Sequence, residues 1–217
     1  RLLPENGLPK YCLCHPTGKR CLLGPGHHLY YCSRGGHPTR RHDTVVTVGA
    51  KVLSRVVPSL RFAAEPPTRR DYRADLEIMG LGERFVVDVS ITHAIQRPHL
   101  SGCSRRASFL TDIIERKKTL KHAPPGSPLE QAFCTWAFTS FGGIGKASYK
   151  ALVRIACLAA VHSTKSAYTI LGHLVYALCV TVAKGGAQAF LKSRAALACA
   201  HADPTIRQHQ RQQELAQ

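Results

Sequence analysis

The sequence predicts an α/β fold, because helical and strand-like apolar patterns follow one another in the order helix, three strands, helix, strand and further helices. Hydrophobic residues make up 44% of the chain and charged residues 20%, a balance typical of a protein with a packed core. A length of 217 residues suffices for one medium α/β domain and a small additional module. We therefore expect one main domain with a satellite segment.

Residues 1–38 form the predicted satellite, since they are rich in Cys, His, Gly and Pro and have no sustained apolar period. Nine cysteines, an odd number, and histidines near four of them favour metal binding over disulfides. Two closely spaced thiolates followed by a His-x4-Cys pair can supply the four ligands of a structural zinc ion. The expected zinc ligands are Cys12, Cys14, His27 and Cys32. Cys21, His15 and His28 compete for the same places.

The main domain opens with a predicted helix at residues 40–57, where Val45, Val48, Leu53 and Val57 recur at three- and four-residue steps. Three short strand-like runs follow. They cover residues 59–65, 73–81 and 84–92. Proline and glycine separate them, and the second and third runs are predicted to form a hairpin.

A second amphipathic helix is predicted at residues 104–122, ending before Pro124. Its expected inner residues are Phe109, Ile113, Ile114 and Leu120, and its expected solvent-facing residues are Arg105, Arg116, Lys117 and Lys121. Residues 133–141 then read as a strand, in which Trp136 is more typical of a core residue than of a stacking platform.

The remaining chain is predicted to be helical from residue 146 to about 202, with breaks at 163–166 and 185–186. Residues 167–183 resemble a membrane segment, but the run is short and contains His173, so we expect a buried helix and no membrane partner. The predicted domain organisation is a zinc segment at 1–38, an α/β core at 39–150, a helical extension at 151–205 and a polar tail at 206–217.

The net charge favours a polyanionic partner. Lys and Arg number 30 against 13 Asp and Glu, which gives a formal charge of +17 and a pI of about 9.9. Nucleic acid is the usual partner of such a surface, while an anionic membrane or an acidic protein are alternatives. Charge alone does not decide among them.

Asp75 and Asp88 carry the clearest chemical signal, because they lie on successive predicted strands within otherwise apolar patterns. Two strands joined by a tight turn bring such side chains together. Adjacent carboxylates repel each other unless a cation lies between them, and oxygen ligands suit Mg²⁺ or Mn²⁺. Lys118 and Lys121 follow on one face of the next helix, where a lysine can orient a water molecule or neutralise phosphate charge. Either carboxylate alone would more often be a cap or surface residue.

These residues resemble the PD-(D/E)xK superfamily, and specifically the restriction-like endonuclease that ends the polyprotein of early-branching non-LTR retrotransposons. Residues 73–75 are similar to its (R/K)PD motif with Ala in place of Pro, and Asp88 follows at the expected interval. Lys118 and Lys121 are similar to its K-x-x-K-Y-like helix motif, with His122 in the aromatic position. Residues 41–43 are similar to its RH(D/N) element.

The resemblance implies a restriction-endonuclease-like core of a helix, a three-strand meander, a helix and a strand, with catalytic Asp75 and Asp88 binding Mg²⁺ or Mn²⁺. It also implies an upstream zinc knuckle and a reverse-transcriptase domain, a nuclear location, and DNA with the element's RNA as partners. Together with the basic clusters, it gives as candidate DNA-binding residues Arg41, His42, Arg73, Arg105, Arg106 and Lys117. The chain opens on Arg1, and we expect it to be the tail of a longer product. A non-catalytic nucleic-acid-binding module from a decayed element and a basic structural subunit are the alternatives.

Overall fold

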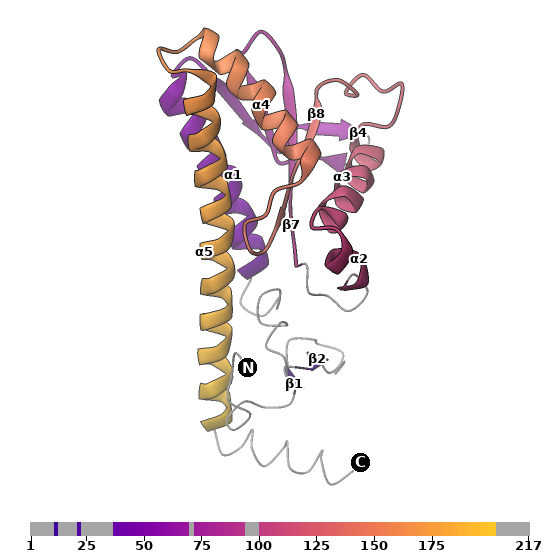
Figure 1. Ribbon diagram of the computed structural model, residues 1–217, viewed down its shortest axis with the longest axis vertical. Helices are drawn as coiled ribbons and strands as arrows, with labels where there is room; N and C mark the ends of the chain where they lie inside the picture. Colours follow the sequence, from indigo (N-terminus) through magenta and orange to yellow (C-terminus); the bar gives the residue numbers. More distant parts are fainter. Residues whose placement is uncertain (1–10, 13–20, 23–36, 70–71, 94–99, 203–217) are drawn as a thin grey trace. The chain divides into compact units, whose positions relative to one another are not determined.

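A computed structural model describes residues 11–12, 21–22, 37–69, 72–93 and 100–202 (Figure 1). The chain divides into two compact units, of which one is Thr39–Lys184 and the other combines Arg1–Pro38 with Gly185–Gln217. In the second unit, strand β1 (Tyr11–Cys12) pairs antiparallel with β2 (Cys21–Leu22), so Cys12 lies opposite Cys21 in the backbone register. The other three predicted zinc ligands, Cys14, His27 and Cys32, lie outside the described residues.

The larger unit is a mixed α/β structure around a four-stranded sheet. The strands are β3 (Arg61–Ala64), β6 (Leu76–Met79), β7 (Phe85–Thr92) and β8 (Phe133–Thr139), in the order β3-β6-β7-β8. β3 and β7 both run antiparallel to β6, whereas β8 runs parallel to β7. A parallel pair needs a crossover connection, and a helix between β7 and β8 provides it.

A second, small sheet lies between β3 and β6 in the sequence. It pairs β4 (Pro67–Arg69) with β5 (Tyr72–Arg73), so the strand predicted at 73–81 is in fact divided into β5 and β6 by the bend at Asp75. The division has a local cause, since Ala74 and Asp75 use their backbone N–H groups to bond Pro66 and Val87.

Helices cover both sides of the sheet, with α1 (His37–Val56) and the part of α5 (Ala167–Ala202) up to Lys184 on one side and α3 (Phe109–His122) on the other (Figure 1). The main core packs α1 and α5 against the inner faces of β6, β7 and β8. Trp136 of β8 is fully buried there, as predicted, and it lies so close to Gly49 of α1 that a Cβ at position 49 would be 2.6 Å from the indole. Gly49 therefore sets how closely α1 approaches the sheet.

The crossover helix differs from its prediction in two ways. The predicted helix at 104–122 consists of α2 (Leu100–Arg105) and α3, with a break at residues 106–108. The expected inner residues Ile113 and Leu120 are 41% and 54% exposed. The buried positions of α3 are instead Leu110, Thr111, Glu115 and His122. The prediction of a purely apolar inner face was wrong, because this side of α3 contacts the Asp88 carboxylate of β7 and the backbone at the start of the next helix.

The C-terminal helices confirm one predicted break and contradict the other. Helix α4 (Lys146–Val161) ends before residues 163–166, as expected, but α5 continues through Gly185 and Gly186. The boundary predicted at residue 150 falls within α4, whose Leu152 and Ile155 are fully buried in the main core. This helix therefore belongs to the α/β unit and not to a separate extension.

Helix α5 buries one stripe of its surface. Ile170, Leu174, Leu178 and Val182 follow one another at four-residue steps and are fully buried, while Tyr168 is 86% exposed. The prediction of a buried helix is therefore correct for one face only. By length and composition, the stretch Ala167–Ala195 passes as a candidate membrane span, a test that core helices of soluble proteins also pass.

Candidate active site

Asp75 and Asp88 occupy neighbouring positions where the start of β6 meets β7, which is the placement that the sequence predicts. Leu76 pairs with Val87 in the antiparallel register of β6 and β7, so Asp75 and Asp88 are the next residues on each strand. The backbone N–H of Asp75 donates to the Val87 carbonyl at 2.9 Å, and the N–H of Val89 donates to Asp75 Oδ2 at 2.6 Å. The ladder therefore fixes both the backbone and the carboxylate of Asp75.

Asp75 is held from the other side by His42 of α1. His42 Nε2 lies 3.0 Å from Asp75 Oδ2, and His42 Nδ1 lies 3.1 Å from Asp43 Oδ1. The hydrogen bond to Asp75 is the main cause that raises the pKa of His42 to about 9. Burial alone would raise the pKa of Asp75, but the hydrogen bonds from His42 and the Val89 N–H lower it below its ordinary value. The two residues form an ion pair at neutral pH.

Asp88 is buried in the middle of β7, with a side chain only 5% exposed. Lys118 Nζ of α3 lies 2.9 Å from Oδ2 and 3.2 Å from Oδ1 of this carboxylate. The charge of Lys118 also lowers the pKa of Asp75, so one ammonium group serves both carboxylates. Of the two lysines that the sequence offered, Lys118 is the one in contact with the acidic pair.

His122, at the end of α3, lies against the other side of Asp88. Its Nε2 is 3.3 Å from Asp88 Oδ1, and its Nδ1 is 2.9 Å from Thr68 Oγ1. The ring stacks on Phe133 with a centroid separation of 5.3 Å and an interplanar angle of 7°. Burial is the main cause that lowers the pKa of His122, against the opposing charge of Asp88. A parallel ring above and an oxygen at Nδ1 fix the orientation of this imidazole.

Lys121 does not contact either carboxylate directly, because its Nζ lies over the ring of Tyr72 at 4.5 Å from the centroid. This ring in turn lies 5.8 Å from that of His122. Lys121 therefore contributes positive charge near the site, and it lowers the pKa of His122.

The candidate DNA-binding residues occupy different environments. Arg41 is buried, with 6% of its surface exposed, so its guanidinium is not part of the exposed basic surface. His42 contacts Asp75 and is therefore part of the acidic site. The remaining candidates are exposed at the surface: Arg73, Arg105, Arg106 and Lys117. Two of these are paired, since Arg73 lies 3.6 Å from Glu65 and Arg106 lies 2.9 Å from Asp112.

The acidic pair fits a divalent cation in its donor chemistry. Within the described residues, both hydrogen bonds to the Asp75 carboxylate go to Oδ2, which leaves Oδ1 for another ligand. Asp88 is buried, and the Lys118 ammonium group, which contacts both of its oxygens, is on a flexible side chain that can move away. In the described ranges, no three His, Cys, Asp or Glu side chains already surround one point, so water and substrate oxygens would have to complete a coordination shell.

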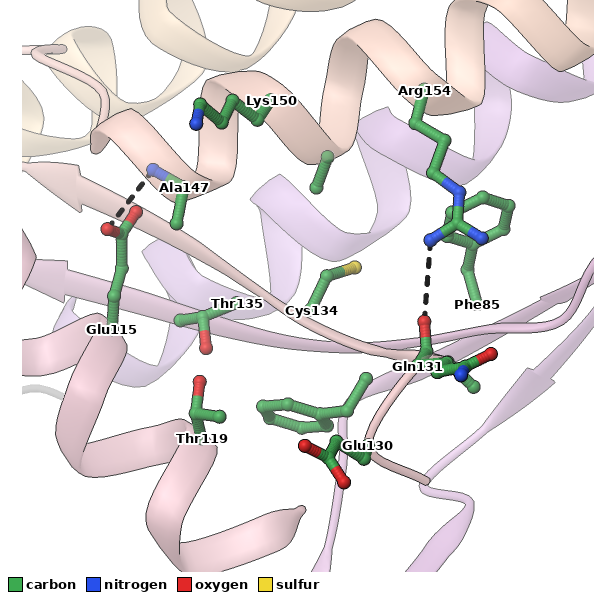
Figure 2. Close-up of a pocket in the computed structure, with 13 residues that line it drawn as sticks. Phe85, Glu115, Thr119, Glu130, Gln131, Cys134, Thr135, Ala147, Lys150 and Arg154 are labelled. Carbon is green, nitrogen blue, oxygen red and sulfur yellow. Dashed lines mark hydrogen bonds between the residues drawn. The ribbon is translucent and has the colours of Figure 1, made fainter. Parts of the chain in front are cut away.

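A separate cavity of about 450 Å³ lies between α3, β8 and α4 (Figure 2). Its lining includes Thr119, Thr135, Lys150 and Glu115, but neither Asp75 nor Asp88. At its wall, the carboxylate of Glu115 accepts hydrogen bonds from the backbone N–H groups of Ala147 and Ser148 and from the Ser148 hydroxyl, at 3.2, 2.8 and 2.6 Å. Glu115 thus caps the start of α4, and the cavity is distinct from the acidic site.

Sequence reasoning missed two contacts of the site. The partnership of Thr68 with His122 joins residues 54 positions apart, and that of His42 with Asp75 joins residues 33 apart. The sequence predicted His42 as a DNA-binding residue and His122 only as part of a helix motif, so neither histidine was expected to contact a carboxylate of the site. No family model matches the sequence, and no curated protein matches it significantly.

Proposed function

We propose that this chain is a divalent-metal-dependent DNA endonuclease, the C-terminal part of a retroelement reverse-transcriptase polyprotein that cuts or nicks target DNA. The observation that carries the proposal is the adjacency of Asp75, immediately before β6, and Asp88 on β7, with Lys118 in contact with Asp88. The strand order β3-β6-β7-β8, with a parallel last strand after a crossover helix, supports the restriction-endonuclease-like core that the motif resemblance implies.

In this mechanism, Asp75 and Asp88 would hold Mg²⁺ or Mn²⁺, which lowers the pKa of a bound water and neutralises charge on the scissile phosphate. The Asp75 carboxylate is oriented before substrate binds, because the Val89 N–H and His42 hold it, while Lys118 and His122 lie against that of Asp88. Lys118 has a side chain that is 30% exposed, so its ammonium group can turn from Asp88 toward a phosphate oxygen or the attacking water. This preorganisation reduces the reorganisation needed during hydrolysis.

Substrate binding would rest on the positive charge of the chain and of α3 in particular. Arg116, Lys117 and Lys121 are exposed on this helix, next to the lysine that contacts Asp88. Cations at such positions neutralise backbone phosphates without reading base sequence. DNA affinity is therefore expected to fall steeply between 50 and 200 mM salt, as for proteins that release counterions.

Nicking of supercoiled plasmid by the purified full chain tests the proposal. The assay compares wild type with Asp75→Asn and Asp88→Asn in Mg²⁺, in Mn²⁺ and in EDTA. Asp112→Asn is the matched control, because it also removes one carboxylate, but one that pairs with Arg106 at the surface. We expect metal-dependent nicking by wild type and the control, and a loss of at least about 100-fold in each site variant.

DNA binding and thermal melting of each variant separate chemistry from folding. A folded Asp88→Asn protein that binds DNA but does not cut supports the endonuclease. Wild-type protein that is folded, binds DNA and never nicks with either metal would instead make the chain the non-catalytic binding module, with His42 and Lys118 as structural partners of the two carboxylates.

A further inference from the structure

The proton positions around His122 follow from the hydrogen bonds of Thr68. The Thr68 hydroxyl has one proton, and it donates this proton to the Tyr72 carbonyl at 3.1 Å. Thr68 Oγ1 must therefore accept at its second contact, so Nδ1 of His122 carries the hydrogen in the 2.9 Å bond between them. In the neutral ring, the lone pair is then on Nε2.

This nitrogen lies next to the carboxylate of Asp88. Nε2 is buried, has no hydrogen-bond donor among the described residues and lies 3.3 Å from Asp88 Oδ1. His122 is only 1% exposed, so bulk water does not solvate this nitrogen. A neutral imine nitrogen and a carboxylate oxygen at this distance repel each other unless a proton or a metal cation lies between them.

We propose that Nε2 of His122 and the carboxylate of Asp88 form a nitrogen–oxygen ligand pair, which selects Mn²⁺ over Mg²⁺ at the site. This inference rests on the proposed function, and it adds a ligand that the carboxylate pair alone does not supply. Imidazole nitrogen favours first-row transition metals, whereas Mg²⁺ prefers oxygen ligands only. Thr68 would be the outer partner that metal-binding histidines usually have, because it accepts the hydrogen of the other ring nitrogen.

The distance between the two donor atoms suits a shared metal. Two ligands each about 2.1 Å from one ion, at an angle of about 90–110°, are separated by about 3.0–3.4 Å. Nε2 and Oδ1 are 3.3 Å apart. The ring is held in this position by its stacking on Phe133, so little rotamer freedom would be lost on binding.

Lys118 is the group that a metal would displace, since its ammonium contacts both oxygens of Asp88. The side chain is 30% exposed, so it can move into solvent or toward a phosphate while His122 stays in place. Metal binding would thereby release the lysine that the proposed reaction uses.

The test is Mn²⁺ and Mg²⁺ binding to the full chain by titration calorimetry, with zinc supplied beforehand, together with electron spin-echo spectroscopy of bound Mn²⁺. The variant is His122→Phe, which keeps an aromatic ring on Phe133 but removes both nitrogens. Thr68→Val is the companion variant, because it removes the acceptor at Nδ1 and leaves Nε2 present. Asp88→Asn identifies which binding event belongs to this site.

In wild type we expect ¹⁴N modulation from a directly bound imidazole, lost in both Asp88→Asn and His122→Phe. The phenylalanine variant should weaken Mn²⁺ binding about tenfold or more and Mg²⁺ binding less than about threefold, and Thr68→Val should weaken Mn²⁺ binding by a smaller factor. Absence of ¹⁴N modulation in wild type, or an unchanged ratio of Mn²⁺ to Mg²⁺ affinity in a folded His122→Phe protein, would overturn the inference. Plasmid nicking that persists in that case would leave the endonuclease proposal standing.

Discussion

Lys118→Met is predicted to destabilise the metal-free protein by about 2 kcal/mol. Removing one partner of a fully buried ion pair typically costs about 3–5 kcal/mol, because the other charge stays buried without compensation. Asp88 is 5% exposed, but the Lys118 side chain is 30% exposed, so solvent already screens part of the interaction. The expected loss of stability is therefore below the range for a fully buried pair. Methionine keeps most of the length and apolar volume of the lysine stem, which limits the loss of packing.

Urea unfolding in EDTA of wild type, Lys118→Met, Asp88→Asn and the double variant measures this interaction as a double-mutant cycle. Asp88→Asn should cost less than Lys118→Met, since the freed ammonium group can reach water. The expected coupling energy is at least about 1 kcal/mol, because the two side chains are in direct contact. A coupling energy below about 0.5 kcal/mol would show that Lys118 does not hold Asp88, and the argument for a lysine positioned at the carboxylates would fail.

Three further predictions test other parts of the structure. Glu115→Ala should lower the free energy of unfolding by about 2–3 kcal/mol in urea, since it leaves three donors at the start of α4 unpaired, and a loss under about 0.5 kcal/mol would contradict the cap. The pKa of His42 is raised from 6.5 to about 9, so its stabilising bond with Asp75 is complete below pH 6.5 and is lost as the pH rises through 9. The stability advantage of wild type over His42→Gln in EDTA should therefore shrink from pH 7 to pH 10, and a constant difference would argue against the ion pair. Burial raises the pKa of Cys134 to about 12, whereas Cys157 is exposed, so iodoacetamide at pH 8 should alkylate only Cys157 of these two in the folded protein, as read by peptide mass spectrometry.

The sequence sufficed for the order of the main elements because their apolar patterns are local. The hairpin turn near Gly80 and Gly82 predicted that Asp75 and Asp88 would meet, and both glycines have the positive φ angles that such a turn requires. The local apolar pattern did not predict the buried face of α3, because that face includes the polar residues Glu115 and His122. A polar residue at a helix position reads as exposed until the partner that satisfies it is known, and here the partners lie on α4 and on β7.

Helix α5 shows the converse case, in which a local signal was overridden. Gly185 and Gly186 predicted a break, but α5 continues through both positions. Glycine costs only about 1 kcal/mol per residue in a helix interior, and a long helix that packs a continuous stripe can absorb this. The pairing of His42 with Asp75 was also beyond local reasoning, since it depends on how the start of α1 lies against the end of a strand.

Anomalous scattering from crystals of the full chain grown with Mn²⁺ would test the central claim most directly. We predict a manganese peak between Asp75 and Asp88, with Lys118 turned away from Asp88. A manganese-loaded crystal with no peak at these carboxylates, and with Lys118 still in contact with Asp88, would contradict the account of this site as a metal-dependent nuclease centre.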